Sequence, residues 1–219
     1  MGARCWGRLL VSALQTALCS GCVGDPVDPA LSDEQREALK ALETDTVPAG
    51  LIQTDAQFDG VHLAGYLLEP RTLALEAGSE VSVTLVWRVE AALESGYRPF
   101  THLLDPDGRI LLNLDDAGPV RAMEGLGGVP WPPSRWQAGS YLLDRLRFTL
   151  PSGAPEQVKL AVGFFRGRER LTPRGGATDP RAGYATIALA VEATSPTVPE
   201  LTAPRLPSGS RIAIDGRLD

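Results

Sequence analysis

The chain has 219 residues, with 27 acidic against 21 basic side chains and a formal net charge of -6. This acidic balance argues against a general nucleic-acid binder. All three cysteines lie within the first 22 residues, so the rest of the chain cannot form a disulfide, a cysteine nucleophile or a thiolate metal site. Eighteen prolines and 23 glycines indicate many turns, which favours an all-β design over a helical bundle.

Residues 1–21 have the layout of an export signal peptide. Two arginines precede the apolar run LLVSALQTALC, which is too short and too interrupted by polar residues to span a bilayer permanently. The next residues, Ser-Gly-Cys at 20–22, resemble the end of a bacterial lipobox, although Cys19 stands where leucine is usual. The resemblance implies that Cys22 is lipidated and anchors the chain to a membrane. An ordinary secretory signal is the alternative, and both interpretations place the domain outside the cytoplasm, in the bacterial cell envelope.

Residues 22–49 are predicted to form a tether and a short N-terminal helix. In the stretch LSDEQREALKALET, Ser32 is placed to cap the helix, and Gln35 lies three residues on, where it completes a capping box. Leu39 and Leu42 supply a thin apolar stripe. The pattern is typical of a small spacer or packing helix.

Residues 50–192 are predicted to form one all-β domain, an immunoglobulin-like or jelly-roll-like antiparallel β-sandwich. In EVSVTLVWRVE every second side chain is apolar, which puts one face of a strand into a core. Further strand-like runs are VHLAGYLL, RPFTHLL, RILLNL, YLLDRLRFTL, QVKLAVGFF and YATIALAV, and turn signals separate them. Seven or more short strands without intervening helices are typical of a sandwich.

The last part of the chain has a different composition. Residues 193–210 are rich in proline and small polar side chains and are predicted to be an extended linker. Residues 211–219, RIAIDGRLD, read as the start of a further strand or of a truncated module. They resemble the first strand of family-9-like carbohydrate-binding modules. A fragment of a longer protein and a frayed C-terminal tail both remain open as interpretations.

Five phrases follow one another between Phe58 and Leu171: FDGVHLAGYLL, AGSEVSVTLVWR, FTHLLDPDGRILLNLDD, PPSRWQAGSYLLDRLRFTLP and VKLAVGFFRGRERL. In this order they resemble an uncharacterised bacterial extracytoplasmic β-sandwich domain, of the kind appended to membrane glycosyltransferases and cell-surface proteins. The match covers roughly half of the chain. Ser79-Glu80, Gly139-Ser140 and Phe164-Phe165 replace the pairs usual in that family. The resemblance implies a sandwich and brings no catalytic residues with it.

The stretch FTHLLDPDGRILLNLDD is dense in side chains that can bind metals, and a calcium loop is one interpretation. Asn113, Asp115 and the later Glu124 nearly match the spacing of oxygen ligands in an EF-hand loop. Ala117 supplies no side-chain oxygen at the fifth position, however, and no helices flank the loop. The three residues are therefore a candidate metal set that departs from the pattern.

Two other interpretations apply to the same stretch. A metal or acid–base site could combine His102 with Asp105, but in a regular strand these side chains point to opposite faces. A hairpin turn at Asp105-Pro106-Asp107-Gly108 explains the residues more simply, because aspartate, proline and glycine each favour a position of such a turn. The hairpin is the favoured interpretation.

Aromatic and basic side chains provide the candidate ligand contacts. Trp131 and Trp136 lie in the loop VPWPPSRW, where exposed rings could stack on sugars; the alternative is that both close the open end of the core. Arg166, Arg168 and Arg170 crowd the stretch FRGRERL and could meet phosphate or uronate groups. The alternative is that these arginines are solvated and paired with nearby acids.

No known catalytic motif stands out in the sequence. There is no Gly-x-Ser-x-Gly elbow and no phosphate-cradling glycine loop, so we assign no catalytic residues and no cofactor. We predict a non-catalytic binding or interaction module of the cell envelope, with glycans as the leading ligand class and no nucleic-acid partner. The alternatives are a structural partner domain that binds an envelope protein and no small ligand, and an envelope polysaccharide hydrolase.

Overall fold

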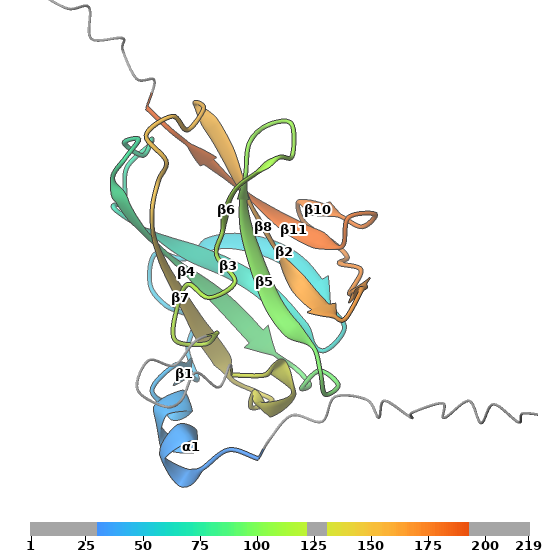
Figure 1. Ribbon diagram of the computed structural model, residues 1–219. Coiled ribbons are helices and arrows are strands. Elements are labelled where there is room, and N and C mark those ends of the chain that lie inside the picture. Colours follow the sequence, from blue (N-terminus) through green and yellow to red (C-terminus); the bar gives the residue numbers. More distant parts are fainter. Residues whose placement is uncertain (1–29, 122–130, 193–219) are drawn as a thin grey trace, which may run out of the picture.

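The computed structural model describes residues 30–121 and 131–192, which form two antiparallel sheets lying face to face (Figure 1). The first sheet has the order β1-β7-β4-β3-β2, with β1 (Glu43–Thr44), β2 (Ile52–Phe58), β3 (Val61–Glu69), β4 (Glu80–Val89) and β7 (Tyr141–Thr149). The second has the order β10-β11-β8-β5-β6, with β5 (Arg98–Leu104), β6 (Ile110–Asn113), β8 (Gln157–Arg166), β10 (Thr178–Asp179) and β11 (Tyr184–Ala190). The short strand β9 (Glu169–Arg170) pairs with β8. The predicted all-β sandwich is confirmed.

The core lies between the sheets and follows from alternating apolar residues. On β4 the side chains at 81, 83, 85, 87 and 89 are all at most 1% exposed. They meet the inward face of β8, and the rings of Trp87 and Phe164 lie 5.0 Å apart between centroids. Because side chains alternate across a strand, the residues between them face outward. The predicted two-residue period is confirmed.

The helix α1 (Asp33–Lys40) lies at one end of the sandwich beside β1 (Figure 1). The predicted capping box is confirmed: the Gln35 amide donates to the Ser32 hydroxyl at 3.1 Å, and the Ser32 amide donates to the Gln35 side chain at 2.8 Å. Leu39 is buried and joins the core. Strand β1, which precedes the predicted domain start at residue 50, pairs with β7.

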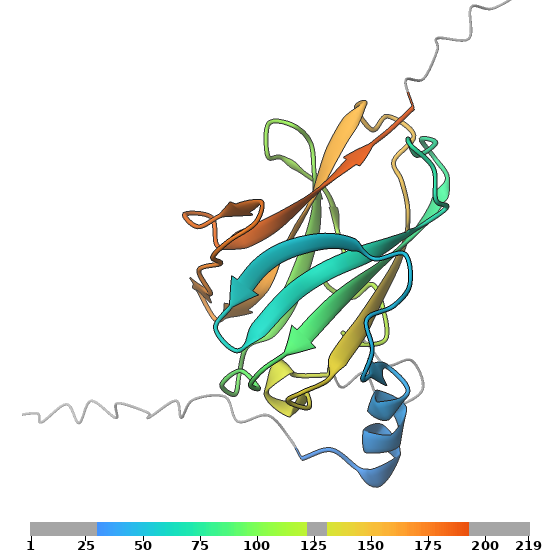
Figure 2. The ribbon, with the colours of Figure 1, turned by 180° about the vertical axis from the view of Figure 1, so that it is seen from behind.

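The segment 45–51 runs from β1, at one edge of the first sheet, to β2 at the other edge (Figure 2). Leu51 packs closely against Gly65: a Cβ atom added to Gly65 would lie 2.8 Å from the Leu51 side chain. The neighbouring Val86, which faces outward on β4, is fully buried. The chain therefore covers part of the outer face of its own first sheet.

Several predicted features fall outside the described residues: the signal peptide 1–21, Cys22, Glu124, the linker 193–210 and the run 211–219. Within the two ranges that the structure describes, no helix has the length and apolar character needed to cross a bilayer.

Candidate functional site

Strands β5 and β6 form the predicted hairpin, and its turn uses the acidic side chain that begins it. The Arg109 amide donates to Asp105 Oδ1 at 2.8 Å, and the Asp105 amide donates to the Arg109 carbonyl at 3.0 Å. Gly108 has a φ of 85°, which only glycine adopts freely. The Asp105 side chain therefore serves the turn, as the hairpin interpretation requires.

The side chains at the end of β6 cap the backbone. Asn113 Oδ1 accepts a hydrogen bond from the Asp115 amide at 2.8 Å, a local turn typical of asparagine. Asp115 Oδ1 accepts from the Thr101 amide at 2.9 Å, and so takes the place of a ladder partner where β6 has ended. In the described parts of the chain, no group of three or more His, Cys, Asp or Glu side chains could hold a metal ion. Asn113 Oδ1 and Asp115 Oδ1 accept backbone amides, and Glu124 lies outside the described residues, so the calcium set stays a prediction.

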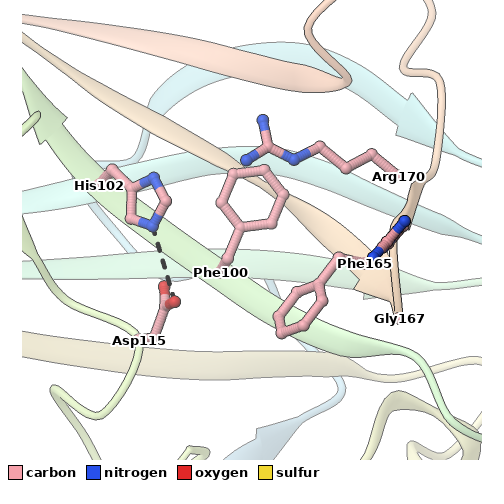
Figure 3. A pocket seen from close by; sticks show the side chains of 7 residues that line it. Phe100, His102, Asp115, Phe165, Gly167 and Arg170 are labelled. Carbon is pink, nitrogen blue, oxygen red and sulfur yellow. Dashed lines mark ion pairs between the residues drawn. The ribbon is translucent and has the colours of Figure 1, made fainter. Parts of the chain in front are cut away.

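A pocket of about 350 Å³ lies on the outer face of the second sheet, beside the β8–β9 hairpin. Phe100 and His102 point outward from β5, and Phe165 points outward from β8, as alternation along the two strands requires. The remaining lining residues are Asp115, Gly167, Arg168 and Arg170 (Figure 3). The pocket therefore joins residues from two stretches of the sequence, 100–115 and 165–170.

One wall of the pocket is aromatic and is braced by an arginine. The guanidinium carbon of Arg170 lies 4.6 Å from the centroid of the Phe100 ring, a distance typical of cation–π contacts (Figure 3). The same side chain donates to the Ala182 carbonyl at 3.0 Å. Phe100 is only 2% exposed, and the ring of Phe165, 6.2 Å away, is partly exposed. Phe165 is thus the ring that offers apolar surface to a ligand.

The polar wall consists of an acid, a histidine and an arginine. His102 Nε2 lies 3.6 Å from Asp115 Oδ2, as the dashed line in Figure 3 marks. Arg168 is exposed, and within the described chain it forms no ion pair or hydrogen bond. Two of the three predicted arginines, Arg168 and Arg170, therefore reach one pocket together with Asp115.

Arg166 occupies a different position from its two neighbours. It donates to Glu94 at 2.8 Å and to Glu169 at 3.4 Å, and its guanidinium lies 4.5 Å from the centroid of the Tyr97 ring. Burial raises the pKa of the Tyr97 hydroxyl, and the nearby Arg166 partly opposes this shift. Because its charge is satisfied by two carboxylates, Arg166 follows the alternative interpretation of a paired surface arginine.

Trp131 and Trp136 do not form an exposed stacking surface. Their exposed fractions are 1% and 2%, and both belong to the core cluster. The Trp136 ring lies 6.0 Å from Trp87 and 5.8 Å from Phe164, centroid to centroid. A buried ring offers no face to a sugar, so the ligand-contact interpretation is corrected for both residues and the core-closing alternative describes them.

A charged cluster inside the sandwich was not predicted. Arg121 donates to Asp144 Oδ2 at 2.9 Å and to the Thr101 hydroxyl at 2.8 Å, and both charged residues are almost fully buried. The Trp87 indole lies 3.5 Å from the same carboxylate oxygen. The run YLLDRLRFTL held a signal for this cluster, because Asp144 occupies an inward position between Leu142 and Leu146.

Comparison with known proteins gives structural likeness without a family. No family model matches the chain, and none of the curated proteins matches it. Among solved structures, the chain is similar to the C-terminal domain of wzt, with 15% identity and a TM-score of 0.41 over 68% of this chain and 84% of that one. It is also similar to a Niemann-Pick type C2 protein from Japanese carpenter ant, with 9% identity and a TM-score of 0.36 over 67% of this chain and all of that one. The function is therefore argued from the pocket itself.

Proposed function

We propose that this chain is a non-catalytic glycan-binding module of the bacterial cell envelope and that the outer pocket of the second sheet is its ligand site. The observation that carries the proposal is the pocket lining: a partly exposed ring from Phe165 faces the same space as the polar groups of His102, Asp115 and Arg168. A sugar has an apolar ring face and several hydroxyl groups, so it can use both walls at once.

The dimensions of the pocket support a small ligand unit. Ligand sites in proteins usually measure about 300–1,000 Å³, so a pocket of about 350 Å³ lies at the small end of that range. A single sugar residue within a chain, or at its end, suits this space better than a long oligosaccharide bound along the sheet. The second sheet thus provides a shallow site with one apolar and one polar wall.

Glycan-array binding by the purified chain tests the proposal. We expect binding that Phe165→Ala removes, because the substitution deletes the exposed ring and leaves the sheet intact. Leu73→Ala is the matched control, since Leu73 is a fully exposed apolar side chain outside the pocket. Failure of the folded chain to bind any glycan, or equal binding by Phe165→Ala, would contradict the proposed function.

Membrane attachment through Cys22 belongs to the same proposal and has a separate test. Labelled fatty acid is expected to enter the full chain during growth in a bacterial host and to be absent from Cys22→Ser. Cys5→Ser is the control, because it removes a cysteine of the same export segment. Labelling that persists in Cys22→Ser would refute the anchor and leave glycan binding unaffected.

A structural partner role is the second candidate, and exposed apolar side chains favour it. Ile52 is 46% exposed and Leu73 fully exposed, and both line a separate pocket that also contains Arg71. Crosslinking of the full chain to an envelope protein, abolished by Leu73→Glu and unchanged by Phe165→Ala, would support this role over glycan binding.

A further inference from the structure

We propose that the sugar unit recognised by the pocket is anionic, a uronate or a sugar phosphate, and that Arg168 is the residue that binds its anionic group. This inference rests on the proposed glycan-binding function and names the ligand class within it. It begins from the three arginines of the β8–β9 region, which have the same charge but differ in what they contact.

Among contacts within 30–121 and 131–192, only one of these three guanidinium groups has no partner. Arg166 is held between Glu94 and Glu169. Arg170 lies over the Phe100 ring and donates to a backbone carbonyl, so it is fixed as part of the aromatic wall. Arg168 lines the pocket and is exposed, and the described residues give it no partner. A free guanidinium matches the two oxygens of a carboxylate or phosphate in a fork-like arrangement.

The negative charge in the pocket does not cancel this attraction. Asp115 Oδ1 already accepts the Thr101 amide, and Oδ2 faces His102 Nε2 at 3.6 Å. Two arginines thus line the pocket against one carboxylate that is partly satisfied. The formal net charge of the chain is -6, so a positively charged pocket departs from the overall balance. A local field of this sign favours anionic ligands.

The neighbouring groups indicate that the anion is carried by a sugar. A simple anion would bind the arginine and would have no use for a hydrogen-bond acceptor. Asp115 Oδ2 is such an acceptor in the same pocket, and it suits a ligand that also carries hydroxyl groups. A hydroxyl group beside the ring could donate to this oxygen while the ring face rests on Phe165. One ligand class, a sugar unit with hydroxyls, an apolar face and an anionic group, uses all three features.

The test compares matched pairs of oligosaccharides by titration calorimetry with the full chain. The pairs are short oligogalacturonides and their carboxyl-reduced forms, hyaluronan oligosaccharides and their carboxyl-reduced forms, and phosphorylated oligomannosides and their dephosphorylated forms. Measurements at about 0.15 M ionic strength limit non-specific attraction. We expect at least one anionic member to bind about tenfold more tightly than its neutral partner, which corresponds to about 1.4 kcal/mol. The pair that shows the preference distinguishes a carboxylate from a phosphate.

Variants connect this preference to Arg168. Arg168→Gln is expected to abolish the difference between the members of a pair, and Arg168→Lys to retain part of it, because lysine keeps the charge and loses the fork. Arg181→Gln is the matched control: it removes one positive charge from an exposed position that does not line the pocket. This control is expected to keep the full preference.

The outcomes separate the two proposals. Equal binding of neutral and anionic members, or a preference that survives Arg168→Gln, overturns the anionic ligand and leaves the glycan-binding function standing. A preference that Arg181→Gln reduces as much as Arg168→Gln also overturns it, because the effect would then be general charge attraction. Binding to no member of any pair overturns the anionic ligand, and the glycan array then decides separately whether the glycan-binding function stands.

Discussion

Strand β5 separates two clusters of charged side chains that contain the same residue types in opposite circumstances. Inside the sandwich, Arg121 and Asp144 are almost fully buried and bind each other. Outside, Arg168 and Asp115 line an open pocket without contacting one another. A buried charge must be paired because desolvation is costly, whereas an exposed charge can remain available for a ligand. The comparison shows that the environment of an arginine, and not its presence, decides whether its charge is paired within the fold or left open to solvent.

The largest expected effect comes from breaking the inner cluster. Asp144→Ala leaves the Arg121 charge buried without its partner, so we expect the free energy of unfolding to fall by about 3–5 kcal/mol. Urea denaturation measures the change. The double variant Arg121→Met with Asp144→Leu removes both charges and is expected to be more stable than Asp144→Ala alone. A loss below about 1 kcal/mol for Asp144→Ala would show that the buried pair is not as isolated from water as its burial indicates.

Asp115 lies in the outer cluster but also supports the fold, so its variants sharpen the comparison. Asp115→Ala removes the acceptor of the Thr101 amide, and we expect a loss of about 1–3 kcal/mol in unfolding free energy. Asp115→Asn keeps an oxygen that can accept the Thr101 amide, so its free energy of unfolding is expected to fall by less. Equal stability of the alanine and asparagine variants would contradict the capping role.

Arg168 is expected to contribute little to stability. Because the side chain is exposed and has no partner in the described chain, Arg168→Gln is expected to change the unfolding free energy by no more than about 0.5 kcal/mol. Thermal and urea unfolding beside the wild type check this expectation. A loss comparable to that of Asp144→Ala would assign Arg168 to the fold and remove the distinction between the two clusters.

The smallest expected effect concerns Glu43. Its side chain is half-buried, between the full burial of Asp144 and the exposure of Arg168. Burial raises the pKa of this carboxyl group above 4.5, although the Gln137 amide partly opposes the shift. The folded chain therefore binds a proton at Glu43 more strongly than the unfolded chain does. This contribution to stability is present below pH 4.5 and is lost as the pH rises through the raised pKa. Glu43→Gln is expected to remove this loss of stability with rising pH. The check is the free energy of unfolding of both proteins, measured below pH 4.5 and above the raised pKa. An unchanged pH slope in the variant would rule out Glu43 as its source.

The fold could be predicted because its determinants are local. The alternation in EVSVTLVWRVE, the turn residues at 105–108 and the Ser32–Gln35 spacing each act within a few residues, and the structure follows all three. The pocket could be predicted only in part. Arg168 and Arg170 belong to a visible basic cluster, but their meeting with His102 and Asp115 depends on the register of β5 against β6 and β8.

The two tryptophans show why exposure could not be predicted from a loop sequence. Proline-rich loops usually run over the surface, and the run VPWPPSRW carries no alternation that would tell an inward ring from an outward one. The short helix η1 (Pro133–Arg135) instead holds Trp136 against Trp87. The inward position of Asp144 was visible in the pattern of its strand, but its partner Arg121 comes from a distant segment without such a pattern.

Thr101 touches both clusters: its hydroxyl accepts a hydrogen bond from Arg121 on the inside, and its amide donates to Asp115 on the outside. Asp115 in the pocket wall is therefore connected to the buried Arg121 through Thr101. A ligand that meets such a preorganised wall does not have to restrict a flexible loop, and the entropy cost of binding is lower. In the glycan site that we propose, the buried pair, although closed to solvent, would thus contribute to the rigidity of the wall that the ligand meets.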